Sequence, residues 1–415
     1  MKINRLESLD YENKSVLVRL DINSPIDIKS HKIINDNRIK KSIDTIKFLM
    51  DNNAKVALIA HQGDTLDYQN LISLEEHALK LSEYLNVKIE YIDDVAGDMA
   101  IRKIKNLKSG ECILLGNLRY LTEEVSSFEQ SVKLTPSEMQ KCYLVRRYKG
   151  LFDYYVNDAF SAAHRNSPSM VAFQKILPSV AGRLFIDEIS NLNKIMNDPM
   201  KPSIFILGGA KISDAFGMID KVLSDNLADK ILTAGITGEI FLIASGYDIG
   251  KKKREFLQEK NLLFFVDDAK KYLNAYPGKI EFPIDLAYEE DEKRKELEIS
   301  ELPKNKMFMD IGKKTLHKYK RVIEEAKTIF VNGPAGVYEL EMFEFGTKEL
   351  WKLISIVEGY SVIGGGDTVN AAAKYIDLNK IDYVCTAGGA MVRYLSGKKL
   401  PLIEAMESSY RENRE

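Results

Sequence analysis

The chain has 415 residues, of which 45% are hydrophobic and 29% are charged, and its formal net charge at pH 7 is −2. This length is typical of two domains, with three possible, and the near-neutral charge argues against a general binder of nucleic acid or membranes. No apolar run approaches the roughly 20 residues that span a bilayer, and the N-terminus has no secretory signal. The three cysteines are far apart, without metal-ligand spacing, so we expect them to be reduced in the cytoplasm.

The first half of the chain alternates short apolar runs with amphipathic stretches. Apolar residues recur at three-to-four spacing in residues 38–53 and 73–85, which predicts two helices. The apolar runs predict strands at 15–22, 55–61, 87–92, 111–116 and 153–160. Strands and helices that alternate in this way favour a parallel sheet with covering helices.

A long amphipathic stretch at residues 181–198 follows, and Pro199 and Pro202 end it. The alternation then restarts, with apolar runs at 203–209, 230–235, 328–336, 361–366 and 382–389. We therefore expect the domain break near the long helix, with a doubly wound α/β sheet on each side.

Charged and polar residues follow the predicted strands of the first half. Ligands bind beyond the carboxyl ends of the strands in such sheets, so these tips should carry the chemistry. The residues are Asp21, Asn23, Arg38, His61, Arg119, Asn157, Asp158, His164 and Arg165. Arginine presents forked donors that match carboxylate and phosphate oxygens, so three arginines on one rim favour a compact, multiply charged anion. Any one of them alone would equally fit a solvated surface charge.

Glycine follows the predicted strands of the second half, at 208–209, 235, 333, 336, 364–366 and 388–389. Glycine lets a ligand touch the backbone, and the helix that follows presents free N–H groups, so five such turns favour a nucleotide. Lys211 would then be the point charge on a transferring phosphoryl group. Tight turns also use glycine for geometry alone, and a lysine at a helix start is often simply solvated.

The usual nucleotide motifs are missing. GYDIGKKK at residues 246–253 is one residue short of a P-loop and lacks the Ser or Thr after its lysine, and no GxGxxG follows a strand. The residues therefore favour a phosphotransferase. An anionic small molecule would bind the basic half, a nucleotide would bind the glycine-rich half, and the cleft would close over both.

The ordered motifs of the chain resemble those of the phosphoglycerate kinase family almost from end to end. In the first half they are VLVRLDINSPI, AHQG, LLGNLRYLTEE and YVNDAFSAAHRNSPS. In the second half they are ILGGAKISD, DIGKKT, NGPAGVYE, FGT and GGGDTVNAA. LTAGITGEIFLIASGYDIG, DIGKKT and the absence of a second lysine after Asp214 resemble the archaeal branch of this family.

This resemblance implies two Rossmann-like domains joined by a hinge. Residues 1–178, with a tail from about 391 to 415, would bind 3-phosphoglycerate, 179–198 would be an interdomain helix, and 199–390 would bind the nucleotide. The implied reaction is reversible phosphoryl transfer between ATP, with Mg²⁺, and the carboxylate of 3-phosphoglycerate in glycolysis and gluconeogenesis. Transfer would be direct and in line after hinge closure. We expect a cytoplasmic monomer, with a dimer left open, and no nucleic-acid or membrane partner.

The site residues that the resemblance implies carry over position by position. Arg38, Lys211, Gly365 and Gly366 would act on the transferring group. The 3-phosphoglycerate site would contain Asp21, Asn23, Arg38, His61, Gln62, Gly63, Asp64, Arg119 and Arg165. The nucleotide site would contain Gly209, Lys211, Asn332, Glu339, Gly365, Gly366, Asp367 and Thr368, with Glu339 on the ribose and Asp367 on Mg²⁺.

The chain departs from the family pattern in three places. TAGGA at residues 386–390 replaces TGGGA, which is a small change in the nucleotide wall, and the other two departures concern the acid site. Asp64 stands where the family usually has a basic residue after HQG, and Gly116 replaces a glutamate before NLR. A carboxylate about 5 Å from an anionic ligand would cost on the order of 3 kcal/mol at an effective dielectric near 20, unless it turns outward. Gly116 is expected to loosen the support of Arg119. A homologue that binds ligands without turnover is the alternative that these two positions motivate.

Overall fold

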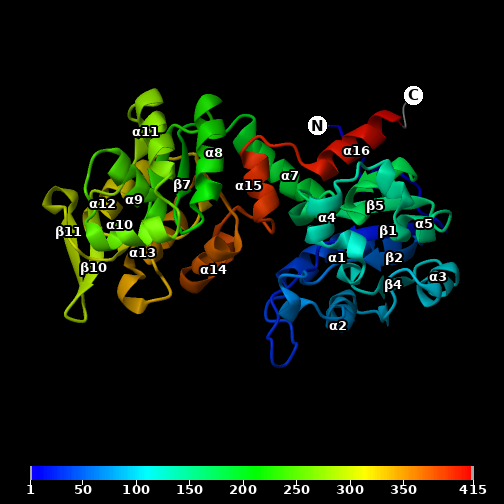
Figure 1. The fold of residues 1–415 in the computed structure, drawn as a ribbon. Coiled ribbons are helices and arrows are strands. Elements are labelled where there is room, and N and C mark those ends of the chain that lie inside the picture. The colour runs from blue at the N-terminus through cyan, green and yellow to red at the C-terminus, as the bar shows by residue number, and fades with distance from the viewer. Residues whose placement is uncertain (1, 413–415) are drawn as a thin grey trace. The chain divides into compact units, whose positions relative to one another are not determined.

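The computed structural model describes residues 2–412 and divides the chain into two compact units (Figure 1). The first unit contains the residues up to Ile189 together with the chain from Lys399 onward, and the second contains Ser190–Lys398. The chain passes from the first unit to the second within α7 (Arg183–Met196), the long helix predicted at 181–198. It returns to the first unit after α15 (Gly389–Leu395), later than the predicted position near 391.

A six-stranded parallel sheet in the order β3-β4-β2-β1-β5-β6 forms the centre of the first unit. Its strands are β1 (Ser15–Leu20), β2 (Lys55–Ile59), β3 (Glu90–Ile92), β4 (Cys112–Leu115), β5 (Tyr154–Asp158) and β6 (Ser179–Ala181). The first five match predicted apolar runs. Strand β6 was not predicted, because its three residues stand between Pro178 and Gly182 and are not part of a longer apolar run.

Helices pack around this sheet, and two of them, at 38–53 and 73–85, were predicted. The helices of the first unit are α1 (Asn37–Asp51), α2 (Glu75–Leu85), α3 (Asp98–Lys105), α4 (Ser126–Val132), α5 (Tyr143–Tyr148), α6 (Pro168–Val171) and α16 (Pro401–Glu412). No helix within residues 2–412 is long and apolar enough to cross a membrane.

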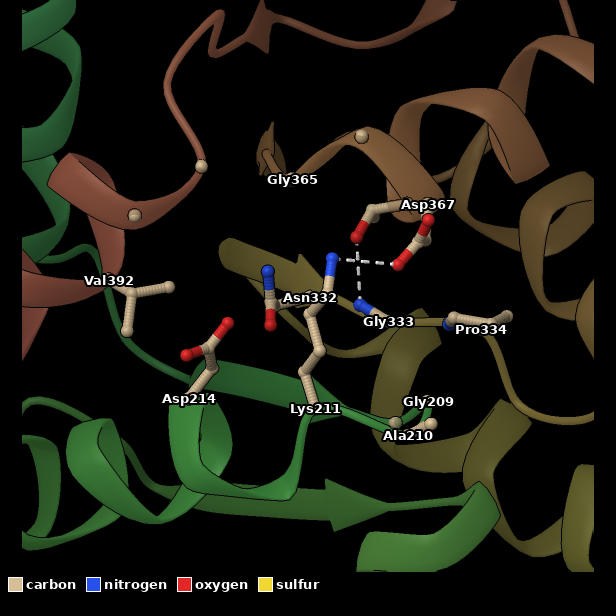
Figure 2. A pocket seen from close by; sticks show the side chains of 15 residues that line it. Gly209, Ala210, Lys211, Asp214, Asn332, Gly333, Pro334, Gly365, Asp367 and Val392 are labelled. Atoms are coloured by element: carbon tan, nitrogen blue, oxygen red, sulfur yellow. Dashed lines mark hydrogen bonds and ion pairs between the residues drawn. The ribbon is translucent and has the colours of Figure 1, made fainter. Parts of the chain in front are cut away.

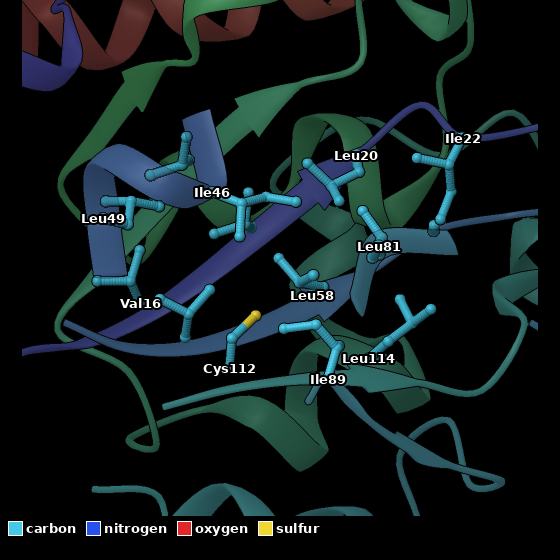
Figure 3. Close-up of a cluster of buried hydrophobic side chains, with 14 of the residues drawn as sticks. Val16, Leu20, Ile22, Ile46, Leu49, Leu58, Leu81, Ile89, Cys112 and Leu114 are labelled. Carbon is cyan, nitrogen blue, oxygen red and sulfur yellow. The ribbon is translucent and has the colours of Figure 1, made fainter. Parts of the chain in front are cut away.

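Strand β1 is buried on both of its faces. Val16, Val18 and Leu20 belong to a hydrophobic cluster that α1 and α2 complete (Figure 3). Leu17 and Arg19 are equally buried, and the alternation of side chains along a strand directs them to the opposite face. Burial on both faces explains the nearly continuous apolar run in the sequence. It also requires that Arg19 find partners inside the protein.

The second unit has its own six-stranded parallel sheet, in the order β15-β14-β13-β7-β8-β9. The strands are β7 (Ser203–Leu207), β8 (Lys230–Thr233), β9 (Ile280–Glu281), β13 (Thr328–Asn332), β14 (Tyr360–Ile363) and β15 (Tyr383–Val384). The helices are α8 (Ile212–Ser224), α9 (Gly235–Ala244), α10 (Lys251–Glu259), α11 (Phe265–Ala275), α12 (Lys313–Glu324), α13 (Phe345–Ile354), α14 (Gly366–Tyr375) and α15. The fold class is therefore the predicted one, with a doubly wound parallel α/β sheet in each unit.

A small antiparallel sheet in the second unit was not predicted. Its order is β11-β10-β12, and its strands are β10 (Asp285–Glu290), β11 (Lys293–Glu298) and β12 (Phe308–Ile311). Strand β11 reads KRKELE and is largely exposed, so it lacks the apolar run by which a strand is recognised in a sequence.

The C-terminal helix α16 packs on the first unit. The backbone N–H of Leu402 donates to the carbonyl oxygen of Ala163 at 3.2 Å. Met406 is almost fully buried, and its sulfur lies 3.6 Å from the amide nitrogen of Gln174. These contacts pack α16 against α6, β6 and the turn at residues 173–175. The hydrophobic cluster that contains Val16 lies entirely within residues 6–180.

The substitution Met406→Ala should destabilise the first unit by about 2–4 kcal/mol, because it leaves a cavity under α16. Chemical denaturation followed by circular dichroism measures this loss. Glu404→Ala on the exposed side of the same helix is the control and should change stability by less than about 0.5 kcal/mol. Equal effects of the two substitutions would show that α16 does not contribute its buried face to the core.

Candidate active site

The carboxyl ends of the parallel strands of the first unit bring most of the predicted anion site together. Asp21 directly follows β1, His61 lies just beyond β2, Arg119 is in a short 3₁₀ turn after β4, and Arg165 lies beyond β5. Arg38 lies in the first turn of α1. We use the name basic rim for Asp21, Asn23, Arg38, His61, Arg119 and Arg165.

Arg38 is positioned by the loop that follows β1. Its guanidinium donates to Oδ1 of Asp21 at 3.3 Å and to the backbone oxygen of Asn23 at 3.2 Å. The Asp21 side chain is only 1% exposed and also accepts a hydrogen bond from Ser161, whereas the Arg38 side chain is 30% exposed. The buried carboxylate therefore fixes the arginine, and the arginine is the member of the pair that solvent reaches.

His61 is a neutral hydrogen-bond donor at the basic rim. Burial lowers the pKa of His61 well below its usual value, and the positive charge of Arg19 adds to this effect. A guanidinium nitrogen of Arg19 lies 2.9 Å from Nδ1 of His61. Because a guanidinium only donates, Nδ1 must accept, and the imidazole proton must sit on Nε2.

Arg19 was missed in the sequence, where it reads as one position of an apolar strand. Its Nε donates to the hydroxyl of Ser169 at 3.2 Å, and that hydroxyl donates to the buried carboxylate of Glu124 at 2.7 Å. Burial raises the pKa of Glu124, although Ser169 and Arg19 oppose the rise. A single arginine inside an otherwise apolar strand was the signal that could have pointed to this support of His61.

Gln62 and Gly63 shape the loop after β2. The Gln62 side chain is fully buried, and its amide bonds the backbone N–H and carbonyl of Ser24 at 2.8 and 3.0 Å. Gly63 has φ +69°, and its carbonyl oxygen accepts from Nε of Arg119 at 3.3 Å. A Cβ on Gly63 would lie 2.5 Å from the backbone of Asn70. Both residues therefore stabilise the conformation of the loop. The Gln62 amide is hydrogen-bonded within the protein.

Two polar residues expected at this edge support the fold. Asn157 is fully buried and donates to the hydroxyl of Tyr155 at 2.7 Å. Asp158 is also fully buried, accepts from the backbone N–H of Phe185 at 2.9 Å, and has its pKa raised to about 7 by burial. The sheet edge therefore contains structural polar residues beside those that reach the rim.

Gly116 does not leave Arg119 loosely held. The Arg119 side chain is only 6% exposed and has the carbonyl of Gly63 and the carboxylate of Asp64 as partners. A Cβ on Gly116 would lie 3.1 Å from the backbone of Asp94 and from Val95, so this chain has little room for a larger side chain here.

Asp64 points into the arginines of the basic rim. Its Oδ2 lies 3.6 Å from a guanidinium nitrogen of Arg119 and 3.8 Å from one of Arg165, and its side chain is 18% exposed. The sequence left open whether the Asp64 side chain turns toward the arginines or away from them, and in the structure it turns toward them.

A pocket of about 290 Å³ lies at the glycine-rich edge of the second unit (Figure 2). Its lining contains Gly209, Lys211, Asn332, Gly365, Gly366, Asp367 and Thr368, all of which were predicted. It also contains Gly208, Ala210, Asp214, Gly333, Pro334, Gly388, Gly389 and Val392. Glu339 was predicted at this site, but it is exposed and is not part of the lining.

Several of these glycines are explained by packing of one loop on another. The backbone N–H of Gly209 donates to the carbonyl oxygen of Pro334 at 2.7 Å. A Cβ on Gly208 would lie 2.3 Å from that oxygen, and a Cβ on Gly333 would lie 2.2 Å from the carbonyl oxygen of Gly208. In this pair of loops, glycine is therefore required because no larger side chain fits.

Gly366 has no such explanation. A Cβ there would meet nothing within 4 Å, and its φ is not in the left-handed region, whereas the neighbouring Gly365 has φ +93°. Gly366 is the first residue of α14, where backbone N–H groups have no partner within the helix and the dipole favours an anion. The open space at Gly366 leaves room for a ligand to approach these backbone N–H groups.

Lys211 and Asp367 meet across the pocket (Figure 2), with Nζ 3.0 Å from Oδ2. Their side chains are 69% and 62% exposed, so the pair contributes little to stability and exchanges partners easily. Thr368 and Asn332 are engaged internally instead. The Thr368 hydroxyl accepts from Gly333 N–H at 2.8 Å, and the Asn332 amide donates to the carbonyl of Gly364 at 2.9 Å.

The donors around this pocket fit a magnesium ion that arrives with phosphates. Magnesium in nucleotide sites is held by one or two carboxylates together with phosphate oxygens and water. Asp367 offers an exposed carboxylate, and Asp214 also lines the pocket. Among residues 2–412, no group of three or more His, Cys, Asp or Glu side chains could hold a metal by itself.

One parallel sheet carries the basic rim, and the other carries a glycine-lined pocket beside a lysine. Together these two features are typical of a phosphotransferase whose acceptor is an anion. The family model described as phosphoglycerate kinase matches residues 6–398. The chain is 41% identical over 408 residues to a phosphoglycerate kinase from Methanothermus fervidus, covering 98% of each chain. It therefore belongs to the phosphoglycerate kinase family, whose phosphoryl acceptor is a carboxyl group.

Solved structures agree with this assignment. The crystal structure of phosphoglycerate kinase from Pyrococcus horikoshii OT3 superposes with a TM-score of 0.89 at 38% identity, covering 99% of this chain and 100% of that one. The structure of phosphoglycerate kinase from Coxiella burnetii gives a TM-score of 0.82 at 30% identity, covering 98% and 99%. The predicted family and its archaeal type are both confirmed.

The two kinds of glycine predict different outcomes for the same substitution. Gly366→Ala should leave stability unchanged or raise it by up to about 1 kcal/mol, and should lower ATP affinity or turnover at least roughly tenfold by obstructing the backbone N–H groups. Gly333→Ala should destabilise by about 1–3 kcal/mol, because φ is +92° and the added Cβ meets Gly208. Thermal unfolding and steady-state kinetics on both variants test this prediction. If Gly366→Ala had both a normal KM for ATP and a normal kcat, a ligand would not explain this glycine.

Proposed function

We propose that the chain transfers the γ-phosphoryl group of ATP reversibly to the carboxylate of 3-phosphoglycerate, giving ADP and 1,3-bisphosphoglycerate. The observation that carries the choice of substrate is the basic rim. Three arginines and a neutral imidazole donor at one sheet edge match a small acid with a phosphate at one end and a carboxylate at the other. Membership of the phosphoglycerate kinase family supports the same pair of substrates.

In this proposal Arg119 and Arg165 hold the phosphate of the acid, and His61 donates from Nε2 to one of its oxygens. Arg38 lies by the carboxylate and stabilises the charge of the transferring group. The nucleophile is a carboxylate oxygen, which is already ionised at pH 7 and therefore needs no general base. A neutral His61 is compatible with this chemistry, because its part is to donate a hydrogen bond.

On the nucleotide side, Lys211 and the N–H groups at the start of α14 would take the phosphates of ATP. Asp367 would hold Mg²⁺, which supplies charge neutralisation at the phosphates when bound. Binding of the phosphates would separate Lys211 from Asp367. Lys211 would then pair with a phosphate, and Asp367 would pair with Mg²⁺. Direct transfer needs the two substrates in line with water excluded, so we retain closure of the two units as part of the proposal.

The three cysteines support a cytoplasmic location as part of this proposal. Cys112, Cys142 and Cys385 are all free and buried. Burial raises the pKa of the Cys142 thiol to about 11, which keeps it protonated and unreactive at neutral pH. Free thiols persist in the reducing compartments of the cell.

A coupled assay with purified protein, ATP, Mg²⁺ and 3-phosphoglycerate tests the proposed reaction by following 1,3-bisphosphoglycerate. The expected result is turnover within the range of ordinary enzymes, roughly 1–10³ s⁻¹. Calorimetric titration with each substrate accompanies the assay. Binding of both substrates without turnover would replace the proposed function by the alternative of a binding protein.

Arg38→Ala should lower kcat by at least about a hundredfold, because it removes a charge-assisted donor that acts on the transferring group. The affinity for ATP should remain within about twofold, since Arg38 lies on the other unit. Lys40→Ala is the control: Lys40 is on the same helix, and its pair with Asp36 is a surface ion pair. If Arg38→Ala turned over like Lys40→Ala, the transferring group would not be placed at Arg38.

A further inference from the structure

We propose that Asp64 is a built-in competitor for the acid substrate, because its carboxylate occupies the position between Arg119 and Arg165 where the substrate's phosphate is to bind. This inference rests on the proposed function. It adds that Asp64, an acidic residue among the arginines of the basic rim, lowers the affinity of the protein for the acid substrate.

The position of Asp64 is built by hydrogen bonds to both of its carboxylate oxygens. Oδ1 accepts from the backbone N–H of Thr65 at 2.7 Å and from its hydroxyl at 3.2 Å. Oδ2 accepts from the hydroxyl of Ser126, and that hydroxyl in turn accepts from the Arg165 guanidinium at 2.5 Å. The carboxylate is therefore held on the arginines by the loop after β2 and by the start of α4.

The contacts with the arginines are ion pairs rather than close hydrogen bonds. The separations of 3.6 Å from Arg119 and 3.8 Å from Arg165 exceed hydrogen-bond distances. Glu129 adds a second carboxylate 3.7 Å from Arg165. The arginines thus keep donor capacity for a phosphate, while the local positive charge is reduced.

Asp64 remains ionised at neutral pH. Partial burial raises its pKa, but the hydrogen bonds from Ser126 and Thr65 and the charge of Arg119 together outweigh burial, so the pKa lies below its usual value. A phosphate that approaches Arg119 and Arg165 must therefore displace a charged carboxylate or bind beside it, and either event weakens binding.

The effect should fall on binding and leave the chemical step unchanged. Arg38, which the proposal places at the carboxylate end of the substrate, is paired with Asp21 and Asn23. Asp64 acts on the arginines at the phosphate end. An interaction that opposes the ground state and the transition state equally raises KM without changing kcat.

The test compares Asp64→Asn with Asp67→Asn. Both remove one negative charge from the same loop, but Asp67 is exposed and accepts from the side-chain amide of Asn70 at 2.7 Å. Asp64→Asn should lower KM for 3-phosphoglycerate about tenfold, with kcat and KM for ATP within about twofold. Its KM for the acid should also rise more steeply with ionic strength, because the rim has gained a net positive charge. Asp67→Asn should behave like the wild type.

Calorimetric titration with 3-phosphoglycerate keeps this test separate from the proposed function. Tighter binding by Asp64→Asn supports the inference whether or not turnover is observed, whereas absent turnover with intact binding counts against the proposed function alone. An unchanged or weaker affinity in Asp64→Asn overturns the inference. Asp64→Ser is a second neutral variant if the first does not fold. Asp64→Glu, which keeps the charge, should retain low affinity, and tight binding by it would assign the effect to packing.

Discussion

Cations held close together repel one another, and the rest of the first unit is arranged around this constraint. The three arginines of the basic rim lie at one sheet edge, with Arg19 buried behind them. Buried carboxylates offset the repulsion: Asp21 bonds Arg38, and Glu124 lies beneath the rim near Arg19. Such buried charges are tolerated only when they are paired and hydrogen-bonded. Burial lowers the pKa of His61, and the positive charge of the arginines lowers it further, so the imidazole is neutral, acts as a donor and is excluded as a base at neutral pH.

The pocket of the second unit is lined mainly by backbone and carries few charged side chains. Its pocket consists of backbone at the strand ends and at the start of α14, with Lys211 as the cation and Asp367 as its partner. Peptide N–H groups at a helix start attract phosphate and do not repel one another as whole charges would. The tight packing of Gly208 against the loop at Gly333 brings the strand ends together, and Gly366 leaves the helix start open. The first unit therefore relies on paired charged side chains, and the second relies mainly on oriented backbone N–H groups.

Much of this arrangement could be predicted from the sequence, because strands buried on both faces leave continuous apolar runs. The runs located β1, β2, β4, β5, β7, β8, β13 and β14, and the rule for parallel sheets placed the residues that follow them at common edges. Elements without that signal were missed. Strand β6 is a short segment between Pro178 and Gly182 without a longer apolar run, and β11 is a charged, largely exposed strand. The hydrogen bonds of the Gln62 side chain to Ser24 were also missed, since a buried amide and a ligand-binding amide look alike in a sequence.

The sequence by itself determined the fold class, the family and the residues that stand at the strand ends, because these depend on local periodicity and on ordered motifs. Only the tertiary structure decided which of those residues pair with one another. It showed that Arg19 supports His61, that Gly366 is open while Gly333 is packed, and that Asp64 turns toward Arg119. The physical reason is that orientation and desolvation arise from contacts between segments far apart in the chain. The pair of Asp64 and Ser126 is such a contact, and no spacing along the sequence encodes it.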